Sequence, residues 1–193
     1  MKRKHLYFFA MAVFISGLGV LASILVMTQH DANNHDDSKQ SASHQHDELN
    51  MPGLHGKDTS KREVDDLKTI FRDHKGISRS VTNLPNGIKT TTEAEDAQLR
   101  DAIISHVSMM VTRLQDGKNP EVQIQSSTLD KLFDFYDQIE TEIELTDLGV
   151  TVLQTSSNPA VVKLLQTHAA EVSEMSARGM AAVHARMKDA SPK

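Results

Sequence analysis

The sequence predicts an α+β domain in which a helix–β-hairpin–helix unit occurs twice, after an N-terminal transmembrane helix. Across residues 67–117, six residues recur unchanged at one fixed spacing further along the chain, and they include two glycines and a histidine. In each unit, apolar residues recur first at helical spacing, then in alternation, and then again at helical spacing. Because each hairpin then has one apolar face, we expect a four-stranded antiparallel sheet with helices packed against that face.

The matched positions indicate an internal duplication. The identical pairs are Leu67/Leu129, Phe71/Phe133, Ile77/Ile139, Gly87/Gly149, His106/His168 and Gly117/Gly179, and their common spacing is called the repeat offset below. Average residue usage would produce roughly three identities over such a length, so the count alone is weak. The kind of position is more telling, because the glycine pairs fall at a predicted turn and at a predicted helix end. Two similar units with coincident spacing are the alternative.

Residues 1–28 are predicted to be a separate segment. Three basic residues, Lys2 to Lys4, precede an uncharged run over residues 6–27 that is long enough to cross a bilayer. The basic flank should stay in the cytoplasm, which places the remainder of the chain on the other side. We expect an uncleaved anchor in a bacterial inner membrane with the domain in the periplasm. A cleaved signal peptide, with a site at residues 20–22, is the alternative.

Residues 29–58 are predicted to form a disordered, histidine-rich linker, because they have almost no apolar content and no periodicity. The histidines of this segment are His30, His35, His44, His46 and His55. Imidazole suits copper, nickel and zinc. The linker is therefore expected either to capture such ions loosely or to act as a polar spacer.

The folded domain is expected over residues 59–188, with the first repeat at about 59–118. Ser60 and Glu63 form a capping box at the start of a helix that runs to about residue 74. A hairpin follows, with a turn at residues 84–87 in which glycine is free to adopt positive φ. Thr92 and Glu95 are expected to cap a second helix that ends near Gly117.

The second repeat is expected at about residues 126–188. Ser127 with Asp130 is the predicted start of a third helix, and the hairpin after it has one apolar and one acidic face. The acidic face is formed by Glu140, Glu142 and Glu144, for which a solvated surface is the ordinary interpretation. Asn158 as N-cap and Pro159 as the first helical residue open a last helix. This helix is expected to run to about Lys188, with Gly179 as a weak point.

A histidine lies in the middle of the apolar face of each long helix. His106 shares a stripe with Leu99, Ile103 and Leu114, and His168 occupies the equivalent place in the second unit. A pseudo-twofold axis between the repeats would bring the two imidazoles together. An unpaired buried imidazole is unfavourable, and a metal ion or haem iron would satisfy its lone pair. The alternative is that each histidine is a core residue hydrogen-bonded to a carbonyl.

The leading interpretation is a membrane-tethered binding protein for a transition metal ion. Copper is favoured because imidazole and thioether ligands suit it. The candidate ligands are His106, His168, Met110, His184, Met180 and His74. A second interpretation is a b-type haem protein for electron transfer or sensing, with His106 and His168 as axial ligands. A third is a cofactor-free interaction module. Arg79 and Arg113 are candidates for pairing with haem propionates or with protein carboxylates.

Composition excludes several other classes. Cysteine is absent, which rules out disulfides, thiolate zinc sites, c-type haem attachment and cysteine nucleophiles. The formal net charge is −5, and it falls to −8 without Lys2, Arg3 and Lys4, so nucleic acid is not an expected partner. There is no nucleophile-elbow, phosphate-loop or HExxH motif, and an enzyme is not expected.

Several short strings resemble those of a family of exported bacterial proteins. They are MPGLHGKDTS, LPNGIKTTTE, HVSMMVTR, HAAEVSEM and GMAAVH, and the resemblance covers about residues 51–187. It implies an extracytoplasmic bacterial domain, and it implies no activity and no ligand set.

Overall fold

The computed structural model describes residues 52–189, which form an α+β domain with a four-stranded antiparallel sheet packed against helices. The expected membrane segment, residues 1–28, and most of the expected linker lie outside the described residues. None of the helices between residues 52 and 189 is both long enough and apolar enough to span a bilayer.

The elements follow the expected order of two helix–hairpin–helix units. The first unit contains α1 (Lys61–Arg72), β1 (Ile77–Leu84), β2 (Gly87–Ala94) and α2 (Ala97–Asp116). The second unit contains α3 (Ser127–Asp134), β3 (Glu140–Thr146), β4 (Gly149–Thr155), α4 (Pro159–Arg178) and α5 (Met180–Asp189). Short 3₁₀ turns are η1 (Pro52–Leu54), η2 (His74–Gly76) and η3 (Tyr136–Gln138). Both ends of α4 follow those of α2 by the repeat offset, and η3 follows η2 by the same spacing.

The sheet register obeys the same offset. The strand order is β1-β2-β4-β3, so that the second strands of the two hairpins pair at the centre. In this pairing Thr90 lies opposite Val152, which is its own counterpart in the second unit. Gly87 lies opposite Thr155, and Gly149 lies opposite Glu93, at the two ends of the same ladder. A local pseudo-twofold axis therefore passes between Thr90 and Val152.

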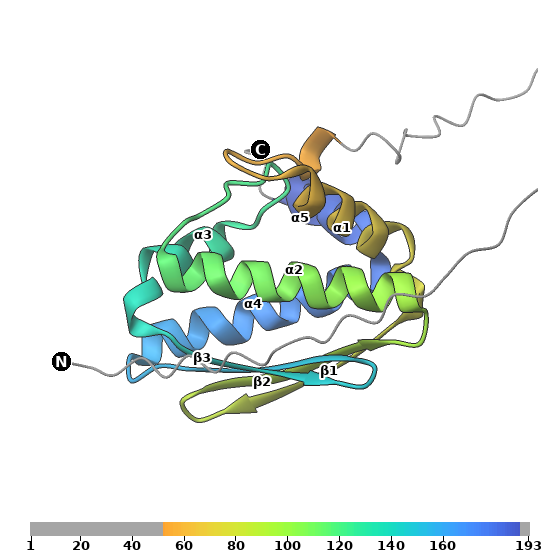
Figure 1. Ribbon diagram of the computed structural model, residues 1–193. Helices are drawn as coiled ribbons and strands as arrows, with labels where there is room; N and C mark the ends of the chain where they lie inside the picture. The colour runs from red at the N-terminus through yellow and green to blue at the C-terminus, as the bar shows by residue number, and fades with distance from the viewer. Residues whose placement is uncertain (1–51, 190–193) are drawn as a thin grey trace, which may run out of the picture. The chain divides into compact units, whose positions relative to one another are not determined.

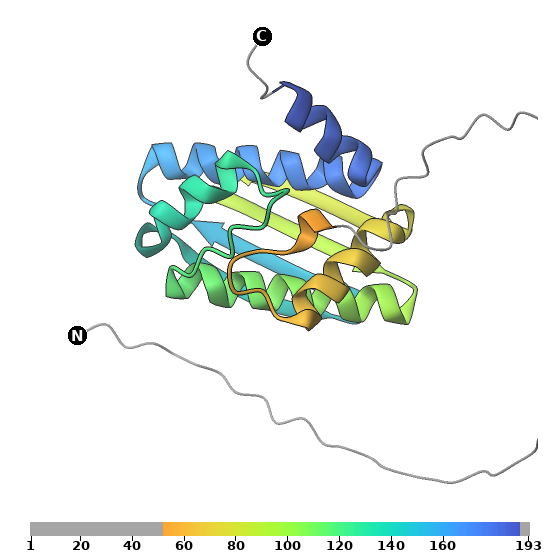
Figure 2. The ribbon, with the colours of Figure 1, turned by 90° about the horizontal axis from the view of Figure 1, so that it is seen from above.

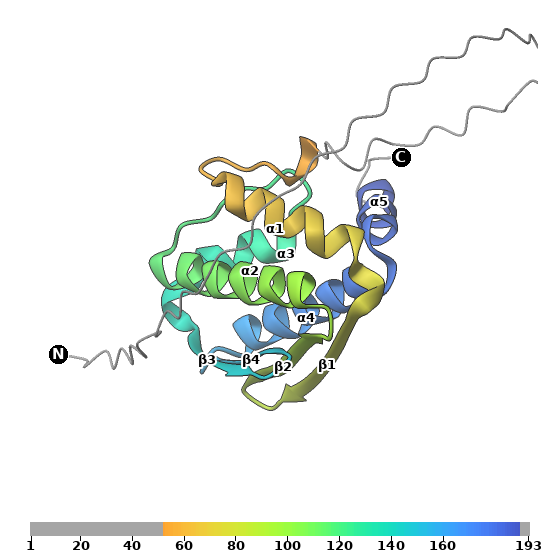
Figure 3. The same cartoon turned by 45° about the vertical axis from the view of Figure 1, so that its right-hand side comes forward.

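The helices form two layers over one face of the sheet (Figures 1 and 3). Helices α2 and α4 lie directly on the strands, along opposite sides of the sheet when it is seen from above (Figure 2). Helix α1 packs on α2, α3 packs on α4, and α5 follows α4. The second layer thus covers the space between the two long helices.

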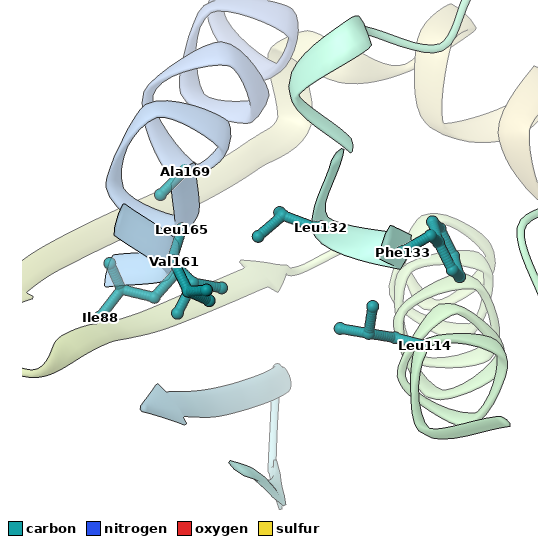
Figure 4. Packing of buried hydrophobic residues seen from close by; sticks show 7 residues of the cluster. All are labelled: Ile88, Leu114, Leu132, Phe133, Val161, Leu165 and Ala169. Atoms are coloured by element: carbon teal, nitrogen blue, oxygen red, sulfur yellow. The ribbon is translucent and has the colours of Figure 1, made fainter. Parts of the chain in front are cut away.

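The core lies between these layers. One buried cluster joins α2, α3, α4 and the central strand β2. In Figure 4, Phe133 of α3 lies over Leu114 of α2, whereas Leu132 faces Leu165 of α4. Helix α3 therefore holds the two long helices at a fixed spacing at one end of the domain.

The glycine pair Gly87/Gly149 is explained by close approaches between β2 and β4 across the pseudo-twofold axis. A Cβ on Gly87 would lie 1.9 Å from the Gln154 carbonyl oxygen, and one on Gly149 would lie 2.1 Å from that of Thr92. Neither glycine has positive φ, so the expectation that the turn at residues 84–87 uses glycine for positive φ was wrong. Glycine is required here because the neighbouring strand leaves no room for a Cβ. Gly117 has φ +66° and ends α2.

Local boundaries differ from expectation at several points. Strand β2 continues to Ala94, so the predicted cap formed by Thr92 and Glu95 was wrong. The N-cap of α2 is Asp96, whose carboxylate accepts a hydrogen bond from the Leu99 N–H at 2.8 Å. The N-cap of α3 is Ser126, one residue before the predicted start. The Ser60/Glu63 capping box and the Asn158 cap with Pro159 are confirmed.

The predicted last helix is divided at Gly179, where φ is +57° and ψ is −140°. At the other end, residues 52–58 belong to the folded domain, although the sequence assigned them to the linker. Leu54 is fully buried beside Val64, Phe71 and Val183, so the ordered domain begins before residue 59.

The outer strand β3 is covered less than expected. Its glutamates are exposed, in agreement with a solvated face, but Ile143 and Leu145 on the opposite face are also 41% and 63% exposed. The apolar alternation of this strand is real, and α2, which contacts β3, covers its apolar face only in part.

Candidate binding cavity between the long helices

A cavity of about 280 Å³ lies in the space enclosed by the sheet, α2, α4 and the upper helices. Its walls are mostly aliphatic and aromatic, with contributions from Ile88 and Val152 of the sheet, Val107 of α2, Val172 of α4 and Phe133 of α3. The sequence places these side chains there because each belongs to the inward face of its strand or helix. The cavity spans the pseudo-twofold axis.

His106 and His168 both line this cavity, as the repeat predicts. Burial lowers the pKa of His106, the negative charges of Asp66 and Glu63 oppose that shift, and the charge of His168 adds to it. His106 is therefore neutral near pH 7, and the two rings lie within electrostatic reach of each other. No hydrogen bond joins the His106 ring to another of the described residues, so the carbonyl-bonded alternative does not apply to it.

His168 is oriented by an acidic neighbour. Its Nδ1 is buried, lacks a hydrogen-bond partner among residues 52–189, and lies 3.7 Å from Oε2 of Glu171 one helical turn later. The ring therefore faces the carboxylate with Nδ1, and Nε2 is the nitrogen not turned toward Glu171.

Glu171 is held in place by helix α3. Its carboxylate accepts hydrogen bonds from Ser126 Oγ at 2.7 Å and Thr128 Oγ1 at 2.8 Å. Burial alone would raise the pKa of Glu171, but the interactions with His168 and with these two hydroxyls lower it to about 2. The side chain is thus a fixed anion beside His168.

Helix α1 provides the acidic groups beside His106. Glu63 is buried and forms an ion pair with Arg113 of α2 at 2.6 Å, and Arg113 also bonds to Asp58 at 2.7 Å. Asp66 Oδ2 is buried without a hydrogen-bond partner, and the nearest cation among the described residues is Arg62 Nε at 3.8 Å. The carboxylates that act on each imidazole therefore come from its own half of the domain, by contact for His168 and through charge alone for His106.

The two arginines singled out in the sequence have different environments. Arg113 is paired with protein carboxylates, as one of the two interpretations expected. Arg79 lies on the helix-facing side of β1, lines the cavity, and forms no ion pair with a carboxylate among residues 52–189.

The remaining predicted ligands are not gathered in one place. Met110 lines the cavity, one helical turn after His106. His74 lies outside it, where its Nδ1 donates to the Ser176 carbonyl at 3.0 Å and its ring packs against Gly179. Met180 packs into the cluster around α1 and α5, and His184 is exposed on α5. The described residues contain no group of three or more His, Cys, Asp or Glu side chains placed to hold a metal ion.

Sequence reasoning did not anticipate the acidic neighbours of the histidines. Glu171 has the i, i+3 spacing from His168 that places both on one helix face, which is a usable signal. Glu63 and Asp66 come from α1, and their approach to His106 depends on how α1 packs across α2.

Comparison of the chain with models of protein families, with curated proteins and with solved structures gave no significant match.

Proposed function

We propose that this domain is a binding protein that holds haem b between α2 and α4, with His106 and His168 as axial ligands. The observation that carries the proposal is that two imidazoles, from equivalent positions of the two long helices, line one apolar cavity. Bis-histidine ligation is an established axial set for haem that is not covalently attached. The role that follows is electron transfer or sensing.

The size of the cavity favours a molecule over a bare ion. Its volume of about 280 Å³ compares with about 30 Å³ per water in the liquid and lies just below the roughly 300–1,000 Å³ of small-molecule pockets, so haem would have to widen it. Mostly apolar walls suit a porphyrin face, whereas an ion with two protein ligands would leave most of the space to solvent.

The carboxylates beside the imidazoles also support iron ligation. Histidines that bind metals generally place their other ring nitrogen against a carboxylate, a carbonyl or water, which fixes the ring and raises its basicity. Glu171 stands in that relation to His168 Nδ1 at 3.7 Å. Asp66 and Glu63 act on His106 through their charge alone.

A copper ion is the second candidate, and the position of Met110 favours it. Met110 lines the same cavity as His106 and His168, so imidazole and thioether groups are available together. In this alternative His74, Met180 and His184 play no part in the ion site, because none of them lines the cavity.

We also propose that the domain arose by internal duplication and that it is exported. The repeat offset shared by the elements and the symmetric sheet register support an internal duplication. We retain the proposals that residues 6–27 anchor the chain in a bacterial inner membrane, or serve as a cleaved signal, and that the domain functions in the periplasm.

The test is titration of the purified full chain with haemin, followed by its absorption spectrum. We expect one equivalent to bind as a six-coordinate, low-spin complex. The His106→Ala and His168→Ala variants should each give a five-coordinate complex, and His184→Ala is the matched control that should resemble wild type. A folded wild-type chain that gives no Soret change would refute haem binding.

A parallel titration with Cu(I) against a competing chelator separates the alternatives. The copper alternative is favoured if the wild-type chain binds Cu(I) stoichiometrically and does not bind haemin. In that case His106→Ala should abolish Cu(I) binding and Met110→Leu should weaken it. If both titrations are silent while the double histidine variant remains folded, the interaction module is the surviving interpretation.

A further inference from the structure

Arg79 is a half-buried charged side chain in the wall of a largely apolar cavity. It occupies the inward-facing position of β1 between Ile77 and Val81, and it lines the cavity. Burial lowers the pKa of Arg79 to about 10, which still leaves the guanidinium protonated at neutral pH. A positive charge therefore faces a space whose walls are mainly hydrocarbon.

The protein provides this charge with neutral partners only, among the described residues. The guanidinium donates to the hydroxyl of Thr92 and, at 3.4 Å, to that of Ser173, and no carboxylate among the described residues pairs with it. Arg113 shows what this fold does elsewhere, since two carboxylates lie 2.6 and 2.7 Å from that guanidinium. A guanidinium has five donors, and a desolvated charge without a counter-ion is unfavourable. An anion entering the cavity would remove that penalty.

A second cation lies along the same end of the cavity. Arg186 of α5 also lines it, donates to the Ile124 carbonyl at 2.7 Å, and approaches Met175 Sδ at 3.9 Å. Ser173 and Met175, which contact the two arginines, both belong to the C-terminal half of α4. The position equivalent to Arg79 in the second unit is Thr141, so the opposite end has no such charge.

We infer that the cavity binds a molecule with an apolar body and a carboxylate, and that Arg79 binds the carboxylate. The inference rests on the proposed function, because it takes the cavity to be the ligand site. Arginine suits carboxylates because its planar fork can bind both oxygens. The carboxylate has two possible sources, a haem propionate or the head of a long-chain fatty acid.

The experiment compares each acid with a neutral partner of the same body, using the full chain. Haemin is compared with its dimethyl ester, and palmitate is compared with hexadecanol by displacement of a fluorescent fatty acid. Wild type should bind the acid about 10- to 100-fold more tightly, which is the range for a charge-assisted hydrogen bond. Arg79→Gln should lose this preference, and Arg79→Lys should keep part of it. The matched control is Arg178→Gln, an exposed arginine at the end of the same helix α4, which should behave as wild type.

Thermal unfolding of the ligand-free protein separates ligand binding from a structural role. Loss of a buried charge that has no counter-ion should leave Arg79→Gln as stable as wild type or more stable. A structural arginine would instead destabilise the chain on removal, and that result would overturn the inference.

The outcomes also separate the two proposals. If haemin and its ester bind equally well, or if Arg79→Gln keeps the preference for the acid, the carboxylate inference fails while haem binding stands. If haemin does not bind but palmitate binds in preference to hexadecanol and depends on Arg79, haem binding fails and the inference stands. If none of the four compounds binds, both fail.

Discussion

Removal of the negative charge of Glu63 should destabilise the domain at neutral pH and have little effect in acid. Glu63 joins three parts of the structure: it closes the capping box of α1 through Ser60, forms an ion pair with Arg113 of α2, and lines the cavity. Its side chain is only 9% exposed, and the 2.6 Å contact to Arg113 is therefore weakly screened. Glu63→Gln keeps a side chain able to complete a capping box and removes the charge.

The magnitude follows from proton linkage. The hydrogen bond from Arg113 is the main cause that lowers the pKa of Glu63 from 4.5 to about 2, against the opposing effect of burial. At about 1.4 kcal/mol per pKa unit, the charged form contributes up to about 3 kcal/mol to the free energy of unfolding at pH 7. Because the pKa is lowered in the folded state, this contribution is present above pH 4.5 and is lost as the pH falls toward about 2.

Urea unfolding of wild type and Glu63→Gln at pH 7, 4 and 2.5 tests this reasoning. We expect a difference of about 2–3 kcal/mol at pH 7 that shrinks progressively at the two lower values. Asp116→Asn is the control, because Asp116 pairs with Lys118 on the surface and should contribute under about 0.5 kcal/mol. A loss below about 1 kcal/mol at pH 7, or one that does not change with pH, would refute the argument.

Three further predictions concern the cap glycines and the cavity. Gly117→Ala should lower the free energy of unfolding by about 1–2 kcal/mol, because φ at this residue is +66°. Gly179→Ala should lower it by more, because the new Cβ would also lie 2.6 Å from the His74 ring. Urea unfolding measures both changes. His106→Leu should raise the melting temperature of the ligand-free protein by about 3–6 °C, because it replaces a half-buried imidazole in an apolar wall by an apolar side chain. A lower melting temperature would contradict that account. Glu171→Gln should raise the midpoint potential of bound haem, measured by spectroelectrochemistry, because a carboxylate at His168 Nδ1 makes the imidazole a stronger donor to ferric iron.

Much of the fold was predictable because local signals and tertiary packing agree. The capping box at Ser60, the Asn158 cap and the alternation of both hairpins are short-range patterns, and each lies where the sequence indicates. The wrong predictions concern positions where packing against a neighbouring element determines the local structure. Strand β2 extends past Thr92 because β4 pairs with it as far as Glu93, which removes Thr92 as a possible helix cap.

The candidate site was predictable in its centre and not in its surroundings. The repeat offset placed His106 and His168 on equivalent helix faces, and a pseudo-twofold fold brings such faces to one cavity. The same sequence could not place His74, because the ring of this residue crosses to the opposite unit and packs on Gly179. Tyr136, its counterpart in the second unit, packs on Gly117 in the same manner. A histidine in one unit and a tyrosine in the other share this position, and each packs its ring against the helix-end glycine of the other unit.

The scaffold is nearly symmetric, whereas the charges that line the cavity are not. Equivalent helices present two imidazoles across the axis, which suits a ligand coordinated from both sides. Arg79 breaks this equivalence, since Thr141 stands in its place in the second unit, and α5 with Arg186 has no counterpart among the described elements. Of the two ends of the cavity, only the one beside Arg79 and Arg186 therefore offers cations from the described residues to a bound anion. Under the inference that Arg79 binds the carboxylate of a ligand, that carboxylate would lie at this end of the cavity, and for haem the propionates would then lie beside the C-terminal half of α4.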